Sequence, residues 1–162
     1  MIVVRRAELD DSEAIAKVLY DSFVEYEPLY APQRFAATVQ PAGGVRERLQ
    51  EGPGWVALVD ETIIGTVAAQ ERSEGLYIRG MGIVPNARGL GIGERLLKAV
   101  EAYARENGFE LMFLGTTPFL DRAIRLYQHF GFVFNEEKNK DSYGTPLLYM
   151  EKRLRENQPN VR

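Results

Sequence analysis

The sequence has 162 residues but no cysteine and only one histidine, which removes several kinds of chemistry. Without cysteine there is no disulfide, no thiolate metal site and no cysteine nucleophile, and we expect no metal in the functional site. Long apolar runs are also missing, so no segment reaches the roughly 18 residues needed to span a bilayer. Residues 1–6 lack the apolar core of a signal peptide. Together these absences predict a cytoplasmic protein with no membrane segment.

An excess of basic residues is absent too, because 20 Lys and Arg stand against 23 Asp and Glu, for a formal net charge of −3. Nucleic-acid-binding domains are usually basic, so we expect no nucleic-acid partner. With 45% apolar and 27% charged residues, the chain is typical of a globular domain with a single core. We predict one domain over residues 1–154 and a polar C-terminal tail over residues 155–162.

The hydrophobic pattern switches between strand and helix periods along the chain. It predicts helices over residues 10–23, 46–50, 91–107 and 119–130, and strands over residues 2–6, 55–59, 62–69, 75–84, 111–114, 132–134 and 147–150. The short connections between residues 55 and 84 indicate an antiparallel meander. We therefore expect an α/β fold with a mixed, mostly antiparallel sheet of about six to seven strands and about four flanking helices. The exposed edge of the last strand would allow a homodimer.

Residues 24–53 are the hardest part to interpret, because prolines and a Gly-Gly pair interrupt the pattern. Tyr26, Tyr30 and Phe35 give this segment an aromatic content that a linker does not need. These side chains either complete the edge of the core or line a substrate entrance.

The most informative segment is the glycine-rich run over residues 88–93, which separates an apolar run from an amphipathic helix. Its alternate glycines let the backbone turn tightly and come close to a ligand. No Ser, Thr or Asp stands before Glu94 to cap the first amides of the helix. Free amides at a helix N-terminus, with Arg88 at the entrance, predict a site for a phosphate or pyrophosphate group.

Several kinds of glycine loop precede helices, and two of them do not fit. A Walker loop requires Lys followed by Ser or Thr after its last glycine, whereas Gly93 is followed by Glu94 and Arg95. The dinucleotide fingerprint requires a further glycine that is missing here, and a parallel βαβ unit where we expect antiparallel strands. A purely structural turn is the simplest alternative, but alternate glycines and an arginine exceed what a turn requires.

The run closely resembles the acetyl-CoA signature of the GNAT superfamily of N-acetyltransferases. That signature has Arg or Gln, two residues, Gly, one residue, then Gly or Ala, and Arg88, Gly91 and Gly93 match it. Residues 122–132 (RAIRLYQHFGF) resemble the later helix of the family and its Gly-Phe exit. The order of elements also fits the family over residues 2–154.

This resemblance implies an acyl-CoA-dependent N-acyltransferase that moves the acetyl group of acetyl-CoA to a primary amine by direct attack. It implies that Tyr127 protonates the leaving thiolate, and that strand backbone holds the pantetheine arm while loop amides hold the pyrophosphate. The cofactor-binding residues implied are Ile83, Val84, Arg88, Gly89, Leu90, Gly91, Ile92 and Gly93. The acceptor would be a small-molecule or peptide amine, and the net negative charge slightly favours a cationic one. A non-catalytic acyl-CoA-binding sensor or partner-binding module on the same fold is the alternative.

Two positions depart from the pattern of the family. The strand before the loop carries no carboxylate to act as general base, which leaves Glu71, Glu74 or a water relay. Leu120 stands where the family often has an asparagine, so Thr116 or Thr117 would supply that contact. Helical periodicity places Tyr127 on the inward face of its helix and His129 about 200° away on the polar face. We interpret His129 as a surface residue.

Overall fold

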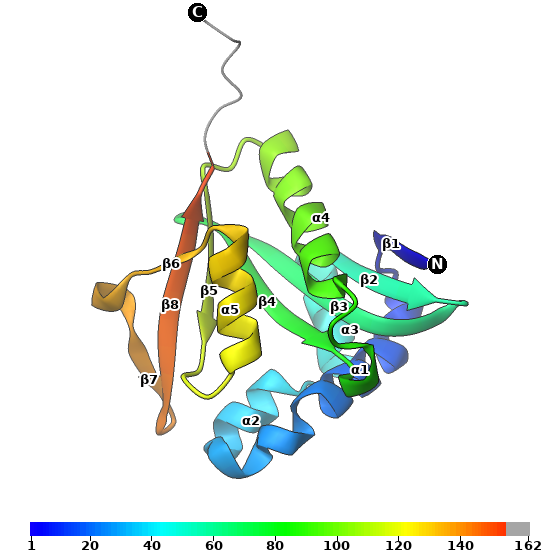
Figure 1. Cartoon of the computed structure of the whole chain (residues 1–162), viewed down its shortest axis with the longest axis horizontal. Helices are drawn as coiled ribbons and strands as arrows, with labels where there is room; N and C mark the ends of the chain where they lie inside the picture. Colours follow the sequence, from blue (N-terminus) through cyan, green and yellow to red (C-terminus); the bar gives the residue numbers. More distant parts are fainter. Residues whose placement is uncertain (155–162) are drawn as a thin grey trace, which may run out of the picture.

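An eight-stranded sheet forms the centre of the computed structural model, which describes residues 1–154 (Figure 1). The strands are β1 (Ile2–Arg6), β2 (Gly54–Val59), β3 (Thr62–Arg72), β4 (Gly75–Ile83), β5 (Leu111–Thr116), β6 (Val133–Phe134), β7 (Lys140–Ser142) and β8 (Thr145–Arg153). Their order in the sheet is β1-β2-β3-β4-β5-β8-β6, and β7 pairs with β8. The tail predicted over residues 155–162 lies outside the described residues.

The described residues also form five α-helices, namely α1 (Ser12–Phe23), α2 (Pro32–Thr38), α3 (Ala42–Glu51), α4 (Ile92–Glu106) and α5 (Asp121–Phe130). The α4 helix packs on β1 to β4 and contacts α5, whereas α1 packs on β3, β4 and α3. Among the described residues, no helix combines the length and the apolarity needed to cross a bilayer. The α/β fold and the mostly antiparallel sheet agree with the expectation from the sequence.

The structure adds α2 and β7 to the elements expected from the sequence. The α2 helix begins at Pro32, whose fixed φ suits the first position of a helix. Sequence patterning did not reveal it because it is only seven residues long and has no regular apolar face. The three residues of β7 are polar and pair only with β8, so they lack the alternation that identifies a strand.

The last strand is not an exposed edge, which corrects one expectation. The β8 strand pairs with β5 on one side and with the short β6 and β7 strands on the other. Its backbone groups are therefore used inside the sheet and are not available to a second copy of the chain.

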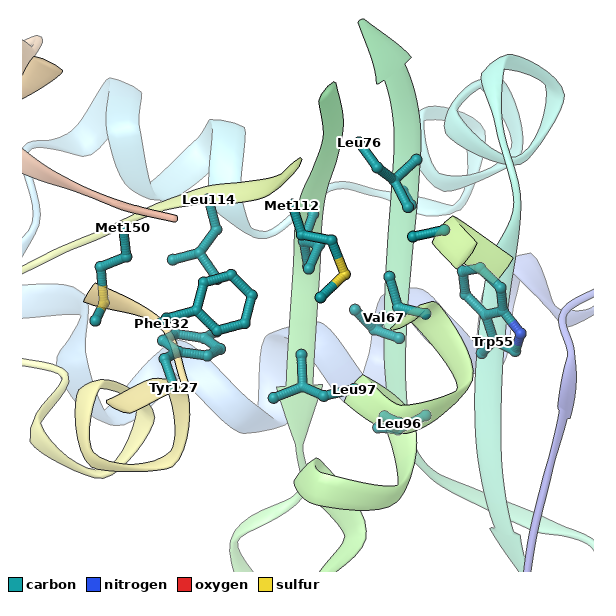
Figure 2. Close-up of a cluster of buried hydrophobic side chains, with 14 of the residues drawn as sticks. Trp55, Val67, Leu76, Leu96, Leu97, Met112, Leu114, Tyr127, Phe132 and Met150 are labelled. Carbon is teal, nitrogen blue, oxygen red and sulfur yellow. The ribbon is translucent and has the colours of Figure 1, made fainter. Parts of the chain in front are cut away.

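Alternation along the strands divides the apolar side chains between two cores. Trp55 belongs to the core under α4 and α5, whereas its neighbour Val56 belongs to the core under α1 and α3. The α4 helix buries Leu96 and Leu97 in the first of these cores, and Figure 2 shows them facing strand side chains. Tyr127 of α5 is part of this same core and lies beside Phe132. Burying the apolar face of α4 thus fixes the position of the glycine-rich run that precedes it.

The sheet opens between β4 and β5, which are its only parallel pair among the described strands. Pairing is confined to Leu76 with Met112 and Tyr77 with Phe113, and beyond Tyr77 the two strands separate. A bulge in β4 accompanies the separation, since Thr66 faces Gly82 while Ala68 faces Arg79. Gly80 adopts the left-handed φ of 62° that this extra residue requires. The last residues of β4 therefore have an open edge that faces the gap.

Candidate active site

Two cavities lie in the gap between β4 and β5. The first, the loop-side cavity, has a volume of about 140 Å³ and is bounded by the end of β4, by α5 and by Arg88. The second, the arginine cavity, has a volume of about 90 Å³ and includes Arg34, Arg48 and Arg79 in its wall. Four residues line both cavities: Phe23, Met81, Leu120 and Tyr127. The two cavities are therefore neighbours with a common wall.

The glycine-rich run presents its backbone to the solvent beside α4. Gly89 and Gly91 have φ angles of 83° and 76°, and a Cβ at either would meet nothing within 4 Å. No side chain of the described residues caps α4, and the amide of Arg95 is the first to bond within the helix, to the Gly91 carbonyl at 3.2 Å. The amides of the preceding three residues therefore remain available, at the positive end of the helix dipole.

The side chains of the same run have other roles. Ile92 is fully buried in the core under α4, and Leu90 is exposed. A Cβ at Gly93 would lie 2.5 Å from Leu126 Cδ2, so Gly93 allows α4 and α5 to pack closely. This run thus contributes its backbone to the site, and its third glycine serves the contact between helices.

Arg88 lines the loop-side cavity but is already partnered. Its Nη2 atom donates to the Ser22 carbonyl at 3.1 Å and forms an ion pair with Glu25 at 2.5 Å. These contacts join the loop to the end of α1 and to the 3₁₀ helix that follows it, Val24–Leu29. A charged group of a ligand would therefore meet an arginine whose charge is partly neutralised.

Ile83 and Val84 differ in what their backbones can bind. The Val84 amide donates to the Ile64 carbonyl at 3.0 Å, and the Val84 carbonyl accepts from Ala87 at 3.0 Å. Ile83 precedes Val84 and faces Gly65 on β3. In an antiparallel ladder such neighbouring pairs alternate, so the amide and carbonyl of Ile83 point away from β3 and into the gap.

Tyr127 stands in the common wall of the two cavities, on the inward face of α5 as the periodicity predicts. Its side chain is buried, and its ring packs edge-on against Phe132 (Figure 2). Its hydroxyl lies 3.8 Å from Met81 Sδ. Burial raises the pKa of Tyr127 well above its ordinary value. The hydroxyl therefore stays protonated at physiological pH and can act as a hydrogen-bond donor or acid.

The other residues singled out in the sequence lie in different places. Glu71 and Glu74 are exposed near the far end of the β3–β4 hairpin and line neither cavity, and His129 is exposed on α5. Thr116 and Thr117 line the arginine cavity, and the buried Thr116 hydroxyl has no hydrogen-bond partner in the described part of the chain. Within that same part, no group of three His, Asp or Glu side chains could hold a metal ion.

Sequence reasoning missed the three arginines of the second cavity. They come from α2, α3 and β4, and no regular spacing connects them in the chain. The aromatic residues of the segment 24–53 were the available signal. Tyr26 lines the loop-side cavity, whereas Tyr30 is buried in the core and also lines the arginine cavity.

Comparison with known proteins places these features in a family. Residues 13–132 match the family model described as the acetyltransferase (GNAT) family. The N-acetyltransferase YjgM of Escherichia coli (strain K12) is 33% identical over 137 residues, which cover 80% of this chain and 81% of that protein.

Solved structures show the same fold. The PaiA N-acetyltransferase of Thermoplasma acidophilum, in complex with coenzyme A, has a TM-score of 0.81 at 17% identity and covers 95% of this chain and 99% of its own. The yncA acetyltransferase of Salmonella typhimurium, with its cofactor acetyl-CoA, has a TM-score of 0.73 at 18% identity and covers 99% of this chain and 98% of its own.

Proposed function

The chain belongs to the acetyltransferase (GNAT) family, and from this membership and the geometry of the two cavities we propose how its residues divide the reaction. The protein is an acyl-CoA-dependent N-acyltransferase that moves the acetyl group of acetyl-CoA to an amine. The family match favours this transferase over a non-catalytic acyl-CoA-binding module. In our proposal the loop-side cavity holds the acetyl-CoA and the arginine cavity holds the amine.

The glycine-rich run suits the pyrophosphate of CoA. Free amides of the first turn of α4, open space above Gly89 and Gly91, and the helix dipole together form an anion site. The outward amide and carbonyl of Ile83 suit the amide groups of the pantetheine arm, which would extend β4 as an added strand. Since the backbone groups of Val84 are already bonded, we assign this role to Ile83 rather than to both residues.

The place of Tyr127 carries the proposal, because its hydroxyl stands in the wall that both cavities share. A free thiol has a pKa of about 8.5 and a free tyrosine about 10, so proton transfer from tyrosine to a thiolate is uphill. Burial raises the pKa of Tyr127 further and makes the transfer less favourable. We therefore propose that Tyr127 donates a hydrogen bond to the developing thiolate. Strand amides near Ile83 would polarise the thioester carbonyl.

The acceptor amine must lose a proton before it attacks. An alkyl ammonium with a pKa of about 10.4 costs about 4 kcal/mol to neutralise at pH 7.4. Among the described residues, none of the side chains that line the two cavities is acidic. We propose that water removes this proton, so that kcat/KM rises with pH up to the pKa of the amine.

The size of the arginine cavity limits the acceptor. A cavity of about 90 Å³ suits a small molecule or the end of a peptide. The cytoplasmic location stays a prediction from the sequence. A homodimer also stays a prediction, without the strand edge on which it was based.

Calorimetric titration with acetyl-CoA tests the cofactor site, and two glycines form a matched pair for it. Gly91 and Gly108 have φ angles of 76° and 75°, and a Cβ at either would meet nothing within 4 Å. Alanine at either position therefore introduces a similar backbone strain of about 1 kcal/mol. We expect Gly91→Ala to weaken acetyl-CoA binding at least tenfold and Gly108→Ala to leave it within twofold. Equal effects of the two substitutions would contradict the loop assignment.

A further inference from the structure

Three arginines from distant parts of the chain converge on the arginine cavity. Arg34 comes from α2, Arg48 from α3 and Arg79 from β4, and each is half-buried. All three line the cavity, whereas no Asp or Glu of the described residues does so. The wall of this cavity therefore carries three positive side chains and no negative one, although the whole chain carries a formal charge of −3.

Only one of these arginines has a carboxylate partner within the described residues. Arg79 forms an ion pair with Glu51 at the end of α3. Arg48 instead donates from Nη2 to the Ala37 carbonyl at 3.0 Å, and Arg34 donates from Nε to the Thr38 hydroxyl at 3.2 Å. Neutral oxygens satisfy some of the donors on Arg34 and Arg48 but do not pair with their charges.

Arg48 occupies the place where β4 leaves β5. A Cβ at Gly80, the bulge residue, would lie 3.1 Å from Arg48 Nη1, so the guanidinium rests against the bulge. The pKa of Arg48 is lowered first by burial and then by the positive charge of Arg79, with a smaller contribution from Arg34. The three charges thus repel one another across one small cavity, and an anion between them would relieve that repulsion.

Further donors in the same cavity wall lack hydrogen-bond partners within the described residues. The Thr116 hydroxyl is buried, with the residue 4% exposed, and has no hydrogen-bond partner among the described residues. The Nε atom of Arg79 is also buried and has no hydrogen-bond partner among the described residues. Buried donors are nearly always satisfied in folded proteins, so unpartnered donors beside the three arginines add to the need of this wall for acceptor atoms.

We propose that the acceptor is an amine that also carries a carboxylate, which the arginine cavity binds through Arg48 and Arg34. This inference rests on the proposed function, since it names the substrate class of the same site. Guanidinium groups bind carboxylates with two parallel hydrogen bonds, and this geometry discriminates against neutral and cationic groups. It replaces the cationic acceptor suggested by net charge, because net charge sums the whole surface whereas recognition depends on the charges within the cavity.

The same charges affect the reacting amine. Positive groups near an ammonium favour its neutral form and lower its pKa. Binding of the carboxylate would bring the amine into this field, where it loses its proton to water more readily. The arginine cavity would then assist deprotonation in a site whose walls carry no acidic side chain.

Thiol release from acetyl-CoA tests the proposal with matched amines. β-Alanine is compared with β-alaninamide and glycine with glycinamide, and spermidine serves as a cationic acceptor. For the wild-type protein we expect kcat/KM at least tenfold higher for each acid than for its amide. Arg48→Met should reduce this ratio at least tenfold, Arg34→Met should reduce it severalfold, and Arg48→Lys should restore part of it.

Arg46→Met is the matched control, because Arg46 is exposed on the same helix and does not line the cavity. It should leave the ratio of acid to amide unchanged. Thermal melting of each variant separates a loss of selectivity from a loss of folding, since Arg48 also contacts the α2 helix through Ala37. A fall in the ratio without a fall in melting temperature supports a role in binding.

The alternative outcomes separate this inference from the proposed function. Turnover of the amides or of spermidine that equals or exceeds turnover of the acids would overturn the inference and leave acetyl transfer intact. If no amine reacts, calorimetry of the CoA-saturated protein with N-acetyl-β-alanine decides, and absence of binding would overturn the inference. Failure to bind acetyl-CoA itself would overturn the proposed function.

Discussion

Tyr127 separates two cavities that are built in different ways. The loop-side cavity is lined by residues of α1, β4 and α5 and by Arg88, which belongs to the continuous run 88–93; this run offers backbone amides, and Glu25 partly neutralises its arginine. The arginine cavity collects side chains from α2, α3 and β4, and two of its three arginines have no carboxylate partner in the described chain. Recognition by backbone amides suits a donor that stays the same between related enzymes. Side chains brought together by the fold can be substituted when the acceptor differs between such enzymes.

The largest effect is expected where the two cavities meet. Tyr127→Phe removes the only hydroxyl of the shared wall and should lower kcat about 100-fold, or about 2.7 kcal/mol, a value at the low end for acid catalysis. The KM for acetyl-CoA should stay within threefold, because the ring still fills its place against Phe132. Steady-state thiol release measures both constants.

Tyr149→Phe is a suitable control for this prediction. The Tyr149 hydroxyl is also shielded from solvent, but the residue lies on β8 and lines neither cavity. Its substitution should change kcat less than twofold. Comparable losses in the two variants would remove Tyr127 from the mechanism.

A smaller effect should separate the two functions of the glycine-rich run. A Cβ at Gly93 would lie 2.5 Å from Leu126 Cδ2, whereas one at Gly89 meets open space. Gly93→Ala should therefore destabilise the protein by about 2 kcal/mol through overpacking between α4 and α5. Gly89→Ala should cost about 1 kcal/mol through its positive φ alone. Urea unfolding measures both losses, and the reverse order would contradict this division of roles.

The smallest effect is expected far from the shared wall of the two cavities. Arg5 donates two hydrogen bonds to Asp11, at 2.8 and 3.0 Å, and lowers the pKa of that carboxyl. Since the folded-state pKa lies below the unfolded value, this stabilisation is present above about pH 4 and is lost as pH falls through the folded-state pKa. Asp11→Asn should cost about 1 kcal/mol at pH 7, a value reduced by solvent exposure of Arg5.

Urea unfolding of wild type and Asp11→Asn at pH 7 and pH 3 checks this sign. The difference between the two proteins should shrink at the lower pH, while kcat at pH 7 stays within twofold. A difference that grows on acidification would contradict the assignment of Asp11 as the stabilising carboxylate.

Local patterns of the sequence determined much of the fold and the donor half of the site. The apolar spacing of residues 91–107 is confirmed by α4, which spans Ile92–Glu106, and the inward position of Tyr127 is confirmed by its burial. Alternate glycines before a helix indicate an anion site because the chemistry resides in the backbone of consecutive residues. Such a site can be recognised from the sequence alone.

Only the tertiary structure decided which side chains line the arginine cavity. The separation of β4 from β5 depends on a bulge at Gly80 and on pairing limited to two residue pairs, neither of which has a local signal. Arg34 and Arg79 are 45 residues apart in the chain (79 − 34). They line the same cavity only because the fold brings α2 and β4 together. Periodicity determines which face of an element is buried, but the charge of a cavity depends on which elements become neighbours. For that physical reason the sequence identified the donor, and the structure was needed to propose the acceptor.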